Sequence, residues 1–97
     1  MRDRPRQLIF RVHAIQRMFE RALTVDDVRQ VLAAGEIIEA YAEDTPFPSR
    51  LVLGWSGRRG IHVVAADNDD AWETIVITVY EPDEAHWEPG LRTRRRQ

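Results

Sequence analysis

The chain has 97 residues, 43% of them hydrophobic, which suits one small core and is too little for two. It contains no cysteine, so disulfides and thiolate metal sites are excluded, and all 14 basic residues are arginine, which excludes a catalytic lysine. The net charge of −2 conceals separate blocks, because residues 1–30 and 92–96 are rich in arginine whereas residues 67–88 hold eight acids and no base. We expect a single cytoplasmic domain over 1–97, with a folded core at about 8–88 and basic, mobile ends at 1–7 and 89–97.

Two helices are expected in the first third of the chain. Residues 13–21 place four apolar side chains at helical spacing, and these should pack on the core: Ala14, Ile15, Met18 and Phe19. Thr24 and Asp27 match a capping box, so the second helix should begin after Thr24 and run from about 25 to 34. Gly35 is a typical residue at a helix end.

After Gly35 the apolar period changes from near four to two, which predicts strands. Four are expected, at residues 36–41, 49–55, 61–66 and 72–80. On the last strand, alternation places Ile75, Ile77 and Val79 on one face. Because the connections are too short for a parallel crossover, the predicted fold class is α+β, with two N-terminal helices packed on a four-stranded antiparallel β-meander.

The first candidate site is the pair His13 and Arg17, which are four residues apart on one helix face. A histidine can accept a proton from a ribose 2′-hydroxyl near neutral pH, and a neighbouring arginine can hold the phosphate that this hydroxyl attacks. The alternative is that both side chains are merely solvated on a helix surface.

Other candidates lie on the strands. His62 sits in an apolar strand, either as a hydrogen-bonded structural histidine or as a second proton carrier facing His13. Tyr80 could orient a phosphate or simply pack at a strand end. Arg50 should lie on the strand face away from Leu51 and could add a phosphate contact. The three histidines lack the spacing of metal ligands, so neither a metal nor another cofactor is expected.

Several spaced motifs resemble the family named domain of unknown function 4258, over residues 10 to about 88. They are His13-Ala14-x-x-Arg17-Met18, the capped helix ending at Gly35-Glu36-Ile37-Ile38, the run Ser49-Arg50-Leu51-Val52-Leu53-Gly54, His62-Val63-Val64, and Tyr80-Glu81-Pro82-Asp83. That family resembles the compact toxin ribonucleases of the MqsR/RelE type. The resemblance implies their fold and, as a partner, a cognate antitoxin with a YgiT-type zinc-finger domain. One departure is Ala22, where the family tends to have glycine, which predicts a more helical turn between the helices.

The residues and the resemblance together predict a type II toxin that cleaves free or ribosome-bound mRNA without a metal. His13 and Arg17 would be catalytic with His62 and Tyr80, and four arginines would bind the substrate phosphates: Arg21, Arg50, Arg92 and Arg94. The alternatives are a non-catalytic module that binds an antitoxin or nucleic acid, and a gyrase poison of similar shape. Three tryptophans, Trp55, Trp72 and Trp87, also predict a protein interface near one sheet edge, and a homo-oligomer is left open.

Overall fold

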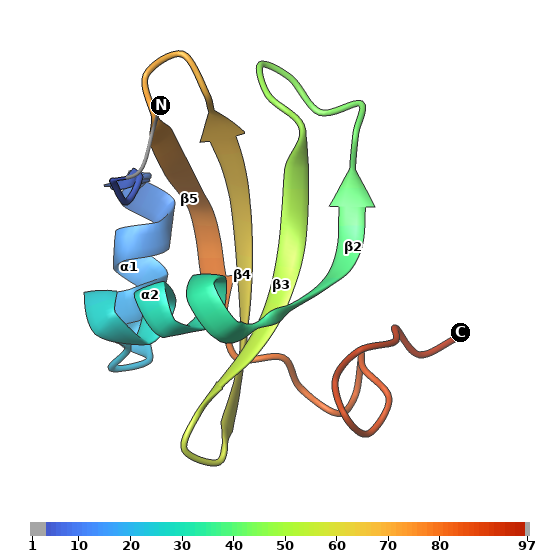
Figure 1. Cartoon of the computed structure of the whole chain (residues 1–97). Helices are drawn as coiled ribbons and strands as arrows, with labels where there is room; N and C mark the ends of the chain where they lie inside the picture. The colour runs from blue at the N-terminus through green and yellow to red at the C-terminus, as the bar shows by residue number, and fades with distance from the viewer. Residues whose placement is uncertain (1–3, 97) are drawn as a thin grey trace.

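The computed structural model describes residues 4–96, and within them shows two helices and a five-stranded mixed sheet (Figure 1). The helices are α1 (Val12–Glu20) and α2 (Val25–Ala34). The strands are β1 (Gln7–Phe10), β2 (Glu36–Tyr41), β3 (Ser49–Ser56), β4 (Arg59–Asn68) and β5 (Glu73–Tyr80), in the sheet order β1-β5-β4-β3-β2. Neither helix is long and apolar enough to cross a bilayer.

The α+β class is confirmed, but the prediction of a four-stranded antiparallel meander is wrong. Strands β2 to β5 do form an antiparallel meander, and β1 adds a fifth strand that runs parallel to β5. A parallel pair needs a long connection, and here nearly the whole domain connects β1 to β5. Four residues are too few to show an alternating pattern, so this strand could not be predicted from periodicity.

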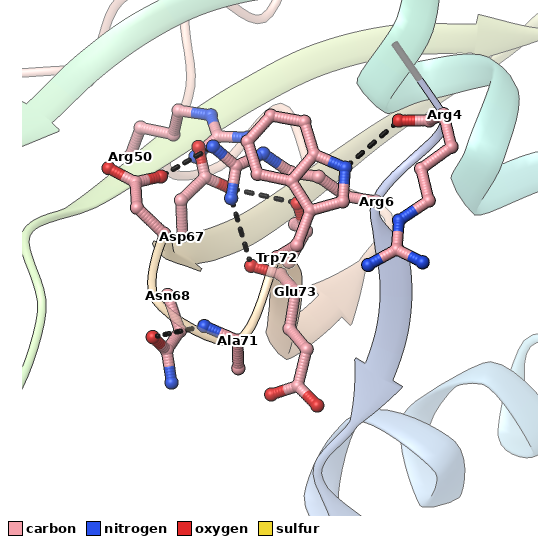
Figure 2. Close-up of polar contacts among 10 residues, drawn as sticks. Arg4, Arg6, Arg50, Asp67, Asn68, Ala71, Trp72 and Glu73 are labelled. Atoms are coloured by element: carbon pink, nitrogen blue, oxygen red, sulfur yellow. Dashed lines mark hydrogen bonds and ion pairs between the residues drawn. The ribbon is translucent and has the colours of Figure 1, made fainter. Parts of the chain in front are cut away.

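Side chains from the β4–β5 turn hold the N-terminal segment at the sheet edge (Figure 2). The Arg6 guanidinium lies 3.9 Å from the centre of the Trp72 ring, pairs with Asp69, and donates to the carbonyl of Glu73 at 3.4 Å. The Trp72 indole donates to the carbonyl of Arg4 at 2.9 Å. Residues 4–7, part of a predicted mobile end, therefore have partners in the fold, whereas residues 1–3 and 97 lie outside the described residues.

The second helix begins where the sequence predicted, and its capping box is confirmed. The Thr24 hydroxyl accepts from the Asp27 amide at 3.1 Å, and the Asp27 carboxylate accepts from the Thr24 amide at 2.9 Å. On the buried face of α2, Val31 lies directly over Gly54 of β3, where a Cβ atom would fall 2.8 Å from the valine side chain. This glycine lets the helix approach the sheet closely.

The first helix presents a different set of side chains to the core from the one predicted. Ala14 and Met18 are buried, but Ile15 is 53% exposed and Phe19 is 88% exposed, so the expectation that all four pack on the core is wrong for these two. The predicted helical turn after α1 is also wrong, because Ala22 has a φ of 53° in the left-handed region that glycine favours. The alanine thus adopts a backbone conformation that glycine would adopt without strain.

A bulge in β5 overturns the predicted strand face. The register changes where Val64 pairs with Thr78 and Ala65 pairs with Val76, so one extra residue, Ile77, is inserted in β5. Val76 and Val79 consequently both join the core under the helices, and Ile75 does not share their cluster. An inserted residue reverses the alternation, which a regular period-two pattern cannot anticipate.

Candidate functional site

The two helices cover one face of the sheet and leave the other without a helix. The two histidines predicted to be catalytic are divided between these two sides. Ile61 and Val63 of β4 belong to the core beneath the helices, so His62 between them points to the opposite face, which we call the open face. His13 lies exposed on α1, in the layer of the helices. His62 and His13 therefore do not face each other, and the predicted pairing of the two histidines is not formed.

The open face gathers five polar side chains that we call the open-face cluster: Glu39, Tyr41, His62, Tyr80 and Arg94. His62 is paired across the sheet with Tyr80 of β5, and its Nδ1 lies 3.1 Å from the Tyr80 hydroxyl. Glu39 and Tyr41 come from β2, and Arg94 comes from the chain after β5. Two of the predicted catalytic residues, His62 and Tyr80, are thus brought together, along with the predicted phosphate ligand Arg94.

The hydrogen bonds of His62 define its tautomer. Nε2 lies 2.9 Å from the carbonyl oxygen of Leu91, which can only accept, so Nε2 carries the proton. Nδ1 is then free to accept the proton of the Tyr80 hydroxyl. Burial lowers the pKa of His62 and raises that of Tyr80, so at neutral pH the imidazole is uncharged and the phenol keeps its proton.

An ion pair stands beside this His62–Tyr80 pair. Arg94 donates to both carboxylate oxygens of Glu39, from Nε at 3.0 Å and from Nη2 at 3.1 Å, and Tyr41 donates its hydroxyl proton to the same carboxylate. Burial alone would raise the pKa of Glu39, but the hydrogen bonds from Arg94 and Tyr41 outweigh it and lower the pKa. The cluster therefore combines a carboxylate, a guanidinium, a neutral imidazole and two phenols.

The C-terminal segment, residues 82–96, covers part of the open face. Trp87 is only 3% exposed, and its ring meets that of His62 edge to face with the centroids 4.4 Å apart. The Arg94 guanidinium lies over the Trp87 ring, 4.7 Å from its centroid, and Arg92 pairs with Glu36 of β2 at 2.7 Å. Beneath this cover the His62 side chain has no exposed surface.

The other predicted site residues do not join the cluster. His13 is exposed, and Arg17 makes an ion pair with Glu20 on its own helix at 3.4 Å. Arg21 caps the end of α1, on the helical side of the sheet. Arg50 does lie on the face away from Leu51, as predicted, but it pairs there with Asp67 at 3.3 Å (Figure 2).

Sequence reasoning missed three residues that form this site: Glu39, Tyr41 and Trp87. Glu39 and Tyr41 are two apart on a strand, a spacing that places both on one face, and this was the available signal. Trp87 follows the last strand in a polar stretch, where nothing local indicates that it folds back onto His62. In residues 4–96, no three histidine, aspartate or glutamate side chains converge as ligands of a metal ion would.

The architecture is that of a small α+β domain with two helices on one face of a mixed sheet and a polar cluster on the other. The family model described as Domain of unknown function (DUF4258) matches residues 10–81, and the chain belongs to this family. Comparison with curated proteins and with solved structures gives no significant match.

Proposed function

We propose that this chain is a metal-independent endoribonuclease that acts in the cytoplasm as the toxin of a toxin–antitoxin pair, with the open-face cluster as its reaction centre. One observation carries the proposal: the Tyr80 hydroxyl is hydrogen-bonded to Nδ1, the unprotonated nitrogen of His62, beside the Glu39–Arg94 ion pair. Cleavage of RNA by its own 2′-hydroxyl requires a proton acceptor, a proton donor and a cation at the phosphate, and the open-face cluster supplies all three, with Tyr41 as the donor. The resemblance of the sequence motifs to toxin ribonucleases supports the same class of reaction.

Because His62 is buried, a proton from the RNA would reach it through the Tyr80 hydroxyl. The 2′-hydroxyl gives its proton to the Tyr80 oxygen while Tyr80 passes its own proton to Nδ1 of His62. The 2′-oxygen then bonds to the adjacent phosphorus and the bond to the 5′-oxygen breaks, while the Tyr41 hydroxyl turns from the Glu39 carboxylate and gives its proton to that leaving oxygen. The products are a 2′,3′-cyclic phosphate and a 5′-hydroxyl.

Arg94 would stabilise the charge that develops on the phosphate. Two of its five N–H groups, on Nε and Nη2, donate to Glu39, and N–H groups that Glu39 does not engage would bind the phosphate oxygens. Its side chain is 59% exposed, so a phosphate can reach it without displacing the C-terminal segment. Glu39 fixes the guanidinium in place, and preorganised donors of this kind are the most effective ones in transition-state stabilisation.

The decisive experiment replaces Tyr80 by phenylalanine, which removes one oxygen atom and no more. Cleavage of a single-stranded RNA in EDTA should fall by about 10²-fold or more, and the wild-type products should end in a cyclic phosphate. His13→Ala and Arg17→Ala serve as controls, because both side chains are remote from the cluster and should leave cleavage within about twofold of wild type. A folded Tyr80→Phe variant with full activity would contradict the assigned reaction centre.

A second candidate is a non-catalytic binding domain of the same fold, and one observation favours it. His62 has no exposed surface and both of its ring nitrogens are hydrogen-bonded, as expected for a structural histidine. In that case the wild-type protein cleaves nothing, with or without ribosomes, while Tyr80→Phe changes only the unfolding free energy.

A further inference from the structure

A hollow lies on the open face of the sheet, next to the open-face cluster. Its volume is about 410 Å³, within the range of about 300–1,000 Å³ that is usual for small-molecule sites. Its apolar lining includes Ala66 and Ile75, which pair across β4 and β5 and do not belong to the core under the helices. Ile77, the extra residue of the β5 bulge, and Phe47, from the loop between β2 and β3, complete this lining. The hollow therefore offers an apolar surface with an aromatic ring, on which a flat ring system can stack.

Two side chains of opposite charge also line the hollow, Arg11 and Asp44. Arg11 precedes α1, and its amide donates to the Val76 carbonyl at 3.0 Å, which fixes its backbone beside β5. The Asp44 carboxylate accepts from the buried Ser49 hydroxyl at 2.5 Å, and its amide donates to the Tyr41 carbonyl at 3.2 Å. The two charges make no ion pair with each other, and in the described part of the chain the Arg11 guanidinium has no ion-pair partner. A ligand in the hollow can therefore bind to both.

We infer that this hollow is the subsite for an unstacked guanine base of the RNA, an inference that rests on the proposed nuclease. Single-stranded RNA is recognised mainly through bases that stack on aromatic side chains and form hydrogen bonds along their edges. Guanine presents two acceptors, O6 and N7, which match the forked donors of Arg11. It also presents two adjacent donors, N1–H and the N2 amino group, which match the carboxylate oxygens of Asp44.

The other three bases match this pair of charges less well. Adenine, cytosine and uracil each have a single donor group on these edges, so they cannot offer a carboxylate two adjacent donors while an arginine binds two acceptors. A site built to bind particular polar groups rejects a ligand that leaves them unpaired. The combination of Arg11 and Asp44 therefore favours guanine over the other bases.

The hollow lies close enough to the proposed reaction centre for one RNA strand to reach both. Ile77 precedes Tyr80 by three residues on β5, which corresponds to about 10 Å along a strand. The loop that carries Asp44 follows β2 directly, and its hydrogen bond to Tyr41 starts from a residue of the open-face cluster. A guanine in the hollow thus allows a nearby phosphate of the same strand to lie at Arg94.

The test measures binding separately from cleavage, with single-stranded oligouridylate in which fluorine replaces every 2′-hydroxyl, so that no nucleophile is present. By fluorescence anisotropy, a strand with one central guanosine should bind about tenfold or more tightly than the same strand with adenosine, cytidine or uridine at that position. Competition with guanosine 5′-monophosphate compares the free nucleotide with the strand. The monophosphate should bind more weakly, because it lacks the neighbouring phosphates that Arg94 contacts.

Two variants test the charged side chains of the hollow. Asp44→Asn keeps an oxygen that can accept from Ser49 but loses the second acceptor, and Arg11→Gln loses the forked donors, so each should reduce the preference for guanosine to about twofold or less. Their matched controls are Glu43→Gln and Arg58→Gln, two exposed residues outside the hollow, and both should keep the preference.

A third variant tests stacking. Phe47→Leu keeps an apolar side chain without the ring, so it should weaken all four strands about fivefold or more while leaving their ranking unchanged.

Equal binding of the four strands by the wild-type protein would overturn the inference. So would a preference that Asp44→Asn leaves intact while its melting temperature stays that of wild type, or a free monophosphate that binds more tightly than the guanosine strand. Cleavage of ribose RNA without any preference for guanosine would likewise contradict the guanine subsite and leave the nuclease standing. A preference for guanosine in a protein that cleaves no ribose RNA would uphold the guanine site and contradict only the proposed nuclease.

Discussion

Replacing Trp87 by alanine should reveal how strongly the C-terminal segment is held on the sheet. The tryptophan is 3% exposed and contacts both His62 and Arg94. A buried tryptophan removes roughly 200 Å² from water, which at about 25 cal/mol/Å² gives an upper estimate of about 5 kcal/mol. Measured truncations of buried aromatic residues cost about 3–5 kcal/mol, so we expect a loss of unfolding free energy in that range.

Trp55→Ala is the matched control, because Trp55 is 45% exposed and its truncation should cost at most about half as much. Urea unfolding followed by far-ultraviolet circular dichroism compares the two variants without relying on tryptophan fluorescence. In a domain of this size, 3 kcal/mol corresponds to a fall in melting temperature of at least about 10 °C. Equal losses in the two variants would refute the packing of Trp87 on His62.

Two further predictions concern His62 and Ala22. The pKa of His62 is lowered by burial, so the unfolded chain binds this proton at a higher pH than the folded chain does. The contribution of His62 to stability is then complete above about pH 6.5 and falls as the pH decreases toward 5, a decline in the urea midpoint that His62→Gln should remove. Ala22→Gly should stabilise the protein by about 0.5–1 kcal/mol because glycine adopts the left-handed φ of 53° without strain, and a lower melting temperature would contradict this.

Local signals in the sequence predicted several elements correctly. The capping box of Thr24 and Asp27 defined the start of α2, since both of its hydrogen bonds join residues three apart. The change of apolar period after Gly35 predicted strands β2 to β5, and each predicted strand end lies within two residues of the observed one. An imidazole in an apolar strand needs a hydrogen-bond partner, which marks His62 as a candidate, and the structure supplies Tyr80, a candidate for its hydroxyl at a strand end, as that partner.

Tertiary structure alone decided the rest. Strand β1 pairs with β5 beside the contact of Arg6 with Trp72, and the contact of Arg94 with Glu39 completes the cluster. These contacts join residues 66 and 55 positions apart, respectively. The rotation of α1 that exposes Phe19 likewise depends on which side of the helix the sheet meets. Periodicity and caps report on neighbours within about one helical turn, so they determine what each segment forms. Which distant side chains come together is determined by how these segments pack, and the local pattern does not contain that information.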